Sequence, residues 1–373
     1  MKFVAIGDIH LYPYTDFSHN IQCCWNGKRY QEDKNGTISM NSRLYNILSA
    51  LCDVRDYCTE NAIDLIANAG DTFHKRGVID VETFNYAHRV FESISEAGIT
   101  MLTISGNHDQ AAASKNPESS VYSFKEYMEV FEKPEIFEYD DSTVFVMIPW
   151  TKDKKQTLNF ISRILKHKSL DKDYILVAHL GISGGLVGSG NFVMSDEYNL
   201  NELNALKFKS CVFGHYHKPQ ILCENSIYTG SLLQNNFNDE GDVHGFWVID
   251  TSKRWDLQMF PLYYPEFITL TSESVKTTPE DVIQDNYTRI QVKAKDAKDV
   301  LDTIEDTDGV RLEIEREYKK SDRSKINVSM SQIQLVETYV KENRVNIPDS
   351  IKSEVLIEKG MDILRKVGEQ NEV

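Results

Sequence analysis

The sequence predicts an α/β fold, and two patterns lead to this prediction. Short apolar runs rich in β-branched residues have the length of buried strands, at residues 2–6, 63–69, 99–104, 174–178 and 211–213. Longer stretches between the first three runs repeat apolar residues at the spacing of one helix face. Strands that alternate with helices are typical of a sheet covered by helical crossovers.

Each helix of the pattern is predicted from one apolar face. The first face holds Leu44, Ile47, Leu48, Leu51, Val54 and Cys58, and the second holds Phe84, Ala87, Phe91 and Ile94. Residues 11–36, rich in Tyr, Asn, Asp and Gly, predict a long irregular loop that either contacts substrate or lies as a surface excursion. Further along, residues 116–172 predict a helix, two strands (135–139 and 144–148) and a helix at 154–167.

The character of the chain changes after residue 264. Strands are predicted at 267–270, 287–292 and 310–315, and helices at 279–284 and 297–305, which is enough for a small α+β module. A polar linker then leads to two helical stretches, the first with Ser331 and Gln334 in a capping-box pattern. We therefore expect three parts: a catalytic domain at 1–264, an α+β domain at 265–325, and a linker with helices at 326–373.

Composition restricts the class of protein. Hydrophobic residues make up 41% of the 373 residues and charged residues 26%, which is ordinary for a globular protein. The net charge of −16 argues against coating of nucleic acid by charge alone, although basic clusters occur at 152–155, 166–168 and 319–323. The six cysteines lack C-x-x-C spacing, and no apolar run reaches the length of a membrane span. We expect a cytoplasmic protein without a leader sequence or membrane contact.

Side chains suited to metal binding follow each of the five strand-like runs. In chain order they are Asp8, His10, Asp71, Asn107, His179, His215 and His217, with His74, His108 and Asp109 among them. Loops that leave the carboxyl ends of strands converge on one edge of such a sheet. One such group alone is more often an ordinary turn with a satisfied histidine, but five groups in order favour a shared site.

The residue types suit a pair of divalent metal ions. Imidazole, carboxylate and carboxamide oxygen bind zinc, manganese or iron(II), and the lack of thiolate argues against a structural zinc site. Asp71 lies in the middle of the series, and its two oxygens could bridge two ions roughly 3.5–4 Å apart. The sequence therefore predicts a two-metal site with Asp71 at its centre.

The order of these motifs resembles the calcineurin-like metallophosphoesterase superfamily. The resemblance rests on Gly-Asp-Ile-His at 7–10, Gly-Asp-Thr-Phe-His at 70–74, Gly-Asn-His-Asp at 106–109, His179 and Gly-His-Tyr-His at 214–217. Residues 228–237, followed by 245–250, are similar to a segment of the SbcD nucleases, the bacterial and phage counterparts of the meiotic-recombination-eleven DNA repair nuclease. Protein phosphatases of the superfamily read G-D-x-V-D-R-G where this chain has His74, which favours a nuclease.

The resemblance implies a β-sandwich flanked by helices and a two-metal hydrolysis of phosphodiesters by a metal-activated water, with manganese as the metal. It assigns Asp8, His10, Asp71 and His217 to one ion and Asp71, Asn107, His179 and His215 to the other. A DNA 3′ oxygen leaves poorly as an alkoxide, so we expect His108 to act as general acid with Asp109 orienting it. We expect His74 to steer the phosphate or the DNA end, with packing beneath the loop as the alternative.

The resemblance also implies DNA duplex ends and single strands as substrates, in recombination, repair or replication. It implies that the α+β module caps the DNA, that the chain forms a homodimer, and that the C-terminal helices dock on an SMC-like coiled-coil ATPase of the SbcC type. These helices could instead fold back on the catalytic domain. Alternatives on the same scaffold are a phosphatase or a cyclic-nucleotide phosphodiesterase. A non-catalytic binding subunit would be favoured by a missing ligand, and none is missing.

Overall fold

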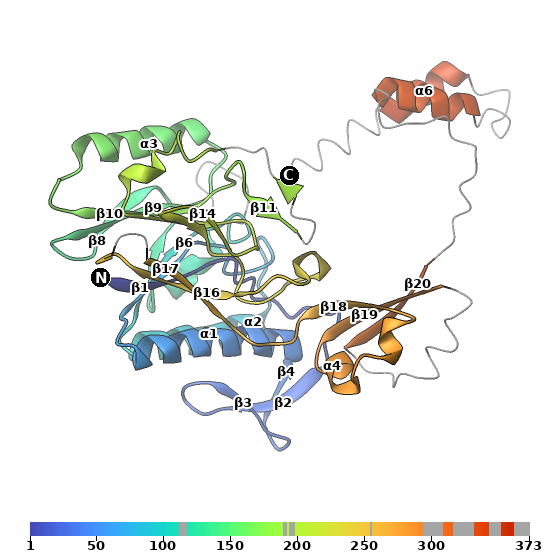
Figure 1. The fold of residues 1–373 in the computed structure, drawn as a ribbon, viewed down its shortest axis with the longest axis horizontal. Helices are drawn as coiled ribbons and strands as arrows, with labels where there is room; N and C mark the ends of the chain where they lie inside the picture. Colours follow the sequence, from blue (N-terminus) through green and yellow to red (C-terminus); the bar gives the residue numbers. More distant parts are fainter. Residues whose placement is uncertain are drawn as a thin grey trace. The chain divides into compact units, whose positions relative to one another are not determined.

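The fold is mixed α/β, as predicted (Figure 1). The computed structural model describes residues 1–111, 118–188, 192–193, 198–253, 256–293, 309–315, 332–342 and 352–361. The chain divides into two compact units, Met1–Glu313 and Ile314–Val373. The predicted metal ligands all belong to the first unit.

Two six-stranded sheets form the first unit. One has the order β17 (Asp256–Pro261), β16 (Gly245–Asp250), β1 (Lys2–Ile6), β5 (Leu65–Asn68), β6 (Thr100–Ile104) and β7 (Glu129–Phe131). The other has the order β14 (Gln220–Cys223), β15 (Ser226–Tyr228), β13 (Ser210–Gly214), β10 (Asp173–His179), β9 (Thr143–Ile148) and β8 (Glu135–Glu138). Parallel pairing joins β1, β5, β6 and β7 in the first sheet and β15, β13, β10 and β9 in the second. Antiparallel strands β16 and β17 extend the first sheet, and antiparallel strands β14 and β8 form the edges of the second.

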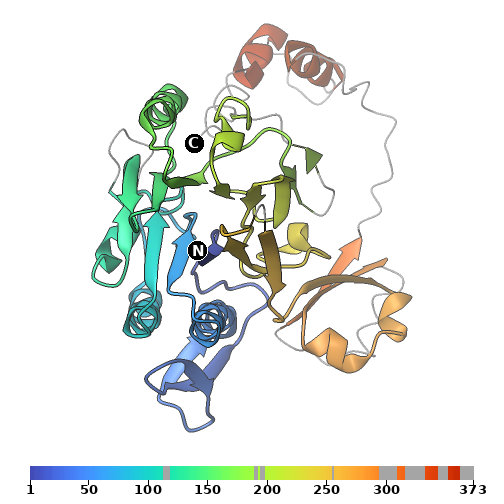
Figure 2. The ribbon, with the colours of Figure 1, turned by 60° about the vertical axis from the view of Figure 1, so that its left-hand side comes forward.

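The alternation of side chains along each strand explains the layers. On β1, Phe3 and Ala5 face the second sheet, where the ring of Phe3 meets Phe145 edge to face at 5.5 Å between centroids. Val4 and Ile6 face the other way, into the core under the helices α1 (Ser42–Glu60) and α2 (Val81–Glu96). The helix α3 (Lys154–His167) covers the outer face of the second sheet (Figure 2).

The helices begin where the sequence supplies a capping side chain. Asn41 accepts hydrogen bonds from the backbone of Arg43 and Leu44 at the start of α1, and Asp80 accepts one from Thr83 at the start of α2. These caps orient both helices as they leave the preceding loops. The predicted helix at 154–167 has the observed bounds of α3.

The prediction of an irregular loop at 11–36 was wrong. Residues 20–41 form a three-stranded antiparallel sheet of β2 (Asn20–Trp25), β3 (Tyr30–Glu32) and β4 (Ile38–Asn41). Residues 26–29 form the turn between β2 and β3, with Gly27 at a φ of 92° and Asn26 Oδ1 accepting from the backbone N–H groups of Lys28 and Arg29 at 2.9 Å. Four-residue hairpin loops are common, but Asn-Gly followed by Lys-Arg within a polar stretch gives no clear strand pattern on either side.

The segment after β6 also differs from its prediction. In place of the first helix predicted in 116–172, the described residues hold one 3-10 turn, η1 (Ser120–Phe124), followed by β7. Val121 and Phe124 of this turn are buried against α2, so a short turn suffices to cover the helix. The remaining short elements are the ribbon β11 (Leu186–Val187) and β12 (Phe192–Val193), and the turns η2 (Ala205–Lys207), η3 (Phe237–Asp239) and η4 (Ser274–Lys276).

The α+β module contains the three strands predicted for it. Its sheet has the order β18 (Phe267–Thr271), β19 (Tyr287–Lys293) and β20 (Val310–Glu315), and α4 (Glu280–Gln284) packs beside β19. The predicted helix at 297–305 lies outside the described residues. The module contacts the rest of the unit through an aromatic cluster of Phe17, Phe237, Phe267 and Tyr287. The division of the chain at 264 and 325 stays a prediction.

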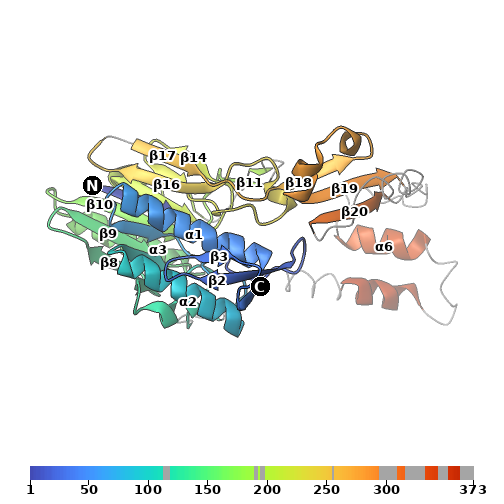
Figure 3. The same cartoon turned by 90° about the horizontal axis from the view of Figure 1, so that it is seen from below.

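The second unit contains two helices in its described part, α6 (Gln332–Glu342) and residues 353–361 (Figure 3). A Cβ atom on Gly360 would lie 2.6 Å from Cγ1 of Val336, so glycine at this position allows the two helices to pack closely. Ser331 of the predicted capping box and Ile363, Leu364 and Val367 of the predicted apolar face lie outside the described residues. Among the helices in the described ranges, none has the length and apolar character needed to cross a membrane.

Candidate metal centre

Loops at the carboxyl ends of five parallel strands bring the predicted ligands together. Asp8 and His10 follow β1, Asp71 follows β5, Asn107 follows β6, His179 ends β10, and His215 and His217 follow β13. Nε2 of His10 lies 3.0 Å from Nε2 of His217, so both rings point into the same space. Oδ1 of Asn107 lies 2.9 Å from Nε2 of His179 and 3.2 Å from Nδ1 of His215.

Asp71 lies between the two predicted ligand sets. Its Oδ2 is 3.9 Å from Nε2 of His10 and 3.4 Å from Nε2 of His179. Donor atoms of Asp8, His10 and His217 lie within 4.8 Å of one another, as do those of Asp8, Asp71 and His179. Buried carboxylates and imidazoles without thiolate are donors suited to two hard or borderline divalent ions, so the residues fit a dimetal centre.

Several of the predicted ligands have left-handed backbone. The φ angles are 47° at Asp8, 52° at His10, 53° at Asp71 and 114° at His215. A non-glycine residue in this region costs about 1–3 kcal/mol and persists only where the surroundings enforce it. Here the loops after β1 and β5 enforce it on each other, because the N–H of Asp8 donates to the carbonyl of Gly70 at 2.9 Å and that of His10 to Asp71 at 3.0 Å.

Hydrogen bonds to carboxylates connect the loops after β13 and β6 to the loops after β1 and β5. The carboxylate of Asp8 accepts the N–H of His215 at 3.0 and 3.1 Å, which ties the loop after β1 to the loop after β13. Oδ1 of Asp71 accepts the N–H of His108 at 2.8 Å, which ties the loop after β5 to the loop after β6. A Cβ atom on Gly106 would overlap this same Oδ1, so the position requires glycine.

Burial and neighbouring charge shift the pKa values of the two central carboxyls in opposite directions. Burial raises the pKa of Asp8 to about 7, although His179 lowers it in part. Burial acts in the same way on Asp71, but the charge of His179 and its hydrogen bond, together with the charge of His10, hold the pKa of Asp71 below its usual value. Asp71 therefore stays ionised, as a bridge between cations requires.

The histidines divide in a similar way. Burial lowers the pKa of His10 well below its usual value and that of His215 to about 3, so both rings are neutral and able to bind a metal. Burial also opposes charge on His179, but the charge of Asp71 and its hydrogen bond raise the pKa of His179 to about 9. Its Nδ1–H donates to the carbonyl of Ala69 at 2.8 Å, which leaves Nε2 facing the centre.

His74 and His108 lie beside the ligands, and both are partly exposed. Their rings stack at 5.6 Å between centroids, and Nδ1 of His108 is hydrogen-bonded to the carbonyl of His74. Nδ1 of His74 lies 3.4 Å from Nδ1 of His10, and the ring also packs against Tyr12 and Tyr14. Burial and the charge of His108 lower the pKa of His74 to about 4.

Asp109 has partners other than the predicted one. Its buried carboxylate accepts backbone N–H groups from Phe73 at 2.9 Å, Gly106 at 3.0 Å and Thr72 at 3.2 Å. Among the described residues, the ring nitrogen Nδ1 of His108 is bonded to the His74 carbonyl and not to Asp109. Asp109 thus joins the loops after β5 and β6 through their backbones.

Sequence reasoning missed a buried arginine that connects the centre to the α+β module. The guanidinium of Arg43, 5% exposed, lies 4.1 Å from the ring centroid of Tyr14, 5.0 Å from that of Phe267 and 5.2 Å from that of Tyr287. It donates to the carbonyl of Asn235 at 2.6 Å. We call these five residues the Arg43 joint.

The Arg43 joint reaches the metal centre by two contacts. Nδ2 of Asn235 lies 3.4 Å from Nδ1 of His217, and Tyr14 packs on His74. A basic side chain in the first turn of a helix is unfavourable, because its charge opposes the helix dipole. Arg43 at the start of α1 was therefore the one signal in the sequence that this arginine has a role outside the helix.

The fold and the donor atoms at its strand ends define a metal-dependent phosphoesterase. Residues 1–219 match the family described as "Calcineurin-like phosphoesterase", which is more than half of the chain. The chain belongs to this family, as its motifs predicted.

Three known proteins are similar to the chain to different degrees. The chain is 27% identical over 199 residues to "Exonuclease subunit 1" of Enterobacteria phage T4, and this alignment spans 52% of the chain and 56% of the phage protein. A solved dimetal phosphatase from Danio rerio covers 66% of this chain with 91% of its own, at 11% identity and a TM-score of 0.40. Another solved structure covers 70% of this chain with 99% of its own, at 10% identity and a TM-score of 0.44. At these scores the family assignment rests on the sequence match.

Proposed function

We propose that the chain is a DNA nuclease that hydrolyses phosphodiester bonds with two divalent metal ions. The observation that supports this most directly is the convergence of all seven predicted ligands, which follow strands of both six-stranded sheets, with Asp71 between the two sets. Similarity to a phage protein named as an exonuclease subunit favours DNA as the substrate within the phosphoesterase family.

The two proposed ligand sets share Asp71. Asp8, His10, Asp71 and His217 would hold one ion, and Asp71, Asn107, His179 and His215 the other. When bound, two divalent ions supply positive charge to the phosphate oxygens and lower the pKa of a water molecule. We propose manganese, although the same donors suit zinc or iron(II).

We propose that His108 donates a proton to the leaving 3′ oxygen. The hydrogen bond to the His74 carbonyl occupies Nδ1 of His108. The proton would therefore leave from the other ring nitrogen, Nε2. His74, neutral at the pKa given above and partly exposed, would position the phosphate. Asp109 would act on His108 through the backbone of the loops that it joins.

The substrate and partner proposals extend to the other parts of the chain. Duplex ends and single strands would bind over the centre, with the module at 265–325 as a cap. The helical part of 326–373, in which α6 and 353–361 pack together through Gly360, would dock on an SMC-like ATPase. A homodimer, acting on DNA in recombination, repair or replication, completes the proposal.

Digestion of end-labelled duplex DNA in the presence of manganese tests the activity. We expect release of labelled nucleotides that is abolished by a chelator and stimulated by ATP when the ATPase is added. Parallel assays with a phosphate monoester and a cyclic nucleotide test the alternatives on this scaffold. Hydrolysis of either small substrate by the chain, with no cleavage of DNA under any metal, would contradict the proposal.

A further inference from the structure

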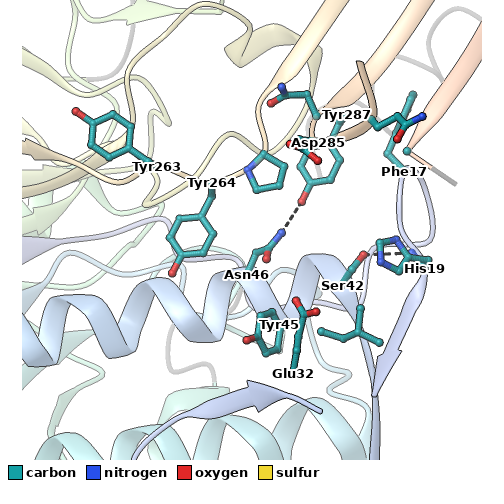
Figure 4. Close-up of a pocket in the computed structure, with 15 residues that line it drawn as sticks. Phe17, His19, Glu32, Ser42, Tyr45, Asn46, Tyr263, Tyr264, Asp285 and Tyr287 are labelled. Carbon is teal, nitrogen blue, oxygen red and sulfur yellow. Dashed lines mark hydrogen bonds between the residues drawn. The ribbon is translucent and has the colours of Figure 1, made fainter. Parts of the chain in front are cut away.

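A cavity of about 920 Å³ lies between α1, the β2–β3–β4 sheet and the α+β module (Figure 4). Its walls are formed by α1, β3, the connection between β17 and β18, and the module. The residues that matter here are Tyr45 and Asn46 of α1, Glu32 of β3, Tyr263 of the connection, and Asp285 and Tyr287 of the module. None of the metal-centre residues lines it. Its size is within the range of ligand-binding cavities, which often lie where two modules meet.

The lining favours a cation over an anion. Glu32 and Asp285 lie on opposite walls, both exposed to solvent, and neither forms a salt bridge with the described residues. Among the described residues that line the cavity none is Lys or Arg, and the one basic side chain is His19, so a phosphate or a nucleic acid strand would find few partners there. The groups of His, Asp and Glu in the described residues that could hold a metal ion do not include residues of this cavity, so its lining suits an organic cation better than a metal ion.

Aromatic rings in the cavity suit a guanidinium or ammonium group. Tyr45, Tyr263 and Tyr287 contribute rings, and Tyr263 is 86% exposed at the rim. Asn46 donates to the hydroxyl of Tyr287 at 3.0 Å and fixes that ring (Figure 4). The Tyr287 ring is buried and already lies 5.2 Å from the guanidinium of Arg43, so the rings open to a second cation are those of Tyr45 and Tyr263.

The strength of such contacts indicates the size of the occupant. Exposed ion pairs and exposed cation–π contacts are each weak, so a single small cation would bind no more tightly than roughly millimolar. A segment that fills the cavity adds apolar and hydrogen-bonding contacts to the charge. The net charge of −16 on the whole chain also favours a basic partner.

We propose that this cavity binds an arginine- or lysine-bearing peptide segment of a partner protein. The cation lies between Glu32 and Asp285, and its aliphatic stem packs on the tyrosine rings. Because the walls belong to α1 and to the module, the bound segment would hold the two together. This inference does not depend on the proposed nuclease activity.

Fluorescence anisotropy on the full chain tests the proposal with a labelled hexapeptide of alternating glycine and arginine. A matched hexapeptide carries citrulline in place of arginine, and a double variant, Glu32→Gln with Asp285→Asn, removes both charges. The control double variant, Glu126→Gln with Asp171→Asn, changes the net charge equally at exposed positions away from the cavity. All four positions are exposed, so the variants should fold, and their melting temperatures check this.

We expect the arginine peptide to bind about tenfold more tightly than the citrulline peptide, and the cavity variant, but not the control, to lose this difference. Equal binding of the two peptides, or equal weakening by both double variants, would overturn the proposal. Arginine amide and spermidine are tested alone, and either one binding as tightly as the peptide would replace the peptide by a small organic cation. Displacement of the peptide by a single-stranded oligonucleotide would show a nucleic acid site and also overturn it.

Discussion

The metal centre and the Arg43 joint are both assembled from distant parts of the chain, yet by different means. The centre uses short polar motifs at strand ends, whose carboxylates bind the backbones of neighbouring loops. The joint uses one buried cation surrounded by the rings of Tyr14, Phe267 and Tyr287. Motif spacing reveals the first kind of assembly and not the second, because aromatic contacts around a cation require no fixed spacing along the chain.

The largest expected effect separates chemistry from metal binding inside the centre. His108→Gln should lower the rate of phosphodiester cleavage by about a hundredfold to ten-thousandfold, because it removes the proposed proton donor and spares the proposed ligands. Manganese titration by calorimetry should be unchanged. Asp71→Asn is the matched variant and should weaken metal binding itself. If His108→Gln lost the metal while Asp71→Asn kept it, the assigned roles would be exchanged.

Gly106→Ala should disrupt the centre without replacing a predicted ligand. The added methyl group overlaps Oδ1 of Asp71, so the loops after β5 and β6 must separate at a cost of about 1–3 kcal/mol. We expect loss of high-affinity metal binding together with a lower melting temperature. Gly98→Ala serves as control: its Cβ meets no atom within 4 Å, but its φ of 77° strains alanine, so it should lower the melting temperature and leave metal affinity unchanged. Normal metal affinity in Gly106→Ala would show that the loops are freer than the hydrogen bonds indicate.

The third experiment tests whether the joint acts on the centre. Arg43→Met leaves the carbonyl of Asn235 without its donor, which should cost about 1–3 kcal/mol of stability. It should also weaken metal affinity about tenfold, because Asn235 supports His217. Arg43→Lys should restore part of both losses. Arg55→Met, at another buried arginine of α1, is the control and should lower stability without weakening metal affinity. If Arg55→Met weakened metal affinity as much as Arg43→Met does, the effect of Arg43 on the centre would be one of general stability alone.

Folding stability and metal affinity should depend on pH with opposite signs. The pKa of His179 is raised to about 9 from a usual value of 6.5, so its contribution to folding is complete below 6.5 and is lost as pH rises through 9. A metal ligand must be neutral, so metal affinity should rise over the same interval, by up to about tenfold per pH unit. Melting of the metal-free protein and calorimetric titration at pH 6.5, 7.5 and 8.5 measure both trends. Parallel trends would contradict the assignment of His179 as the titrating ligand.

The smallest effect on the centre is expected from removal of residues 329–373, which include the helical part of the second unit. A chain truncated after Val328 should cleave small diesters and single strands at an unchanged rate and should lose co-purification with the ATPase. The melting temperature of the catalytic part should also be unchanged. Retained ATPase binding would place the docking site elsewhere, and a lower melting temperature would favour helices that fold back on the catalytic domain.

Much of the fold and of the candidate site could be predicted from the sequence. The predicted strand at 2–6 has the bounds of β1, because a buried parallel strand reads as one apolar run. The candidate ligands could be proposed from the sequence because each follows such a run, and the structure brings their side chains together. The β2–β3–β4 sheet was missed because its half-exposed strands lack an apolar run. The partners of Asp109 could not be predicted, since backbone N–H groups carry no residue identity.

Those backbone partners have a consequence for how the protein acquires metal. Asp109 holds Thr72, Phe73 and Gly106 in one arrangement, and Asp8 does the same for His215. The backbones of the ligand-bearing loops are thus held by hydrogen bonds within the protein, and the carboxylate of Asp109 that accepts three of them is not among the proposed ligands. Binding of a cation therefore costs the protein little conformational entropy, because the donor atoms are already in place. Selection among manganese, iron and zinc then depends on donor chemistry and on the supply of each metal in the cell, and not on the cost of rearranging the loops.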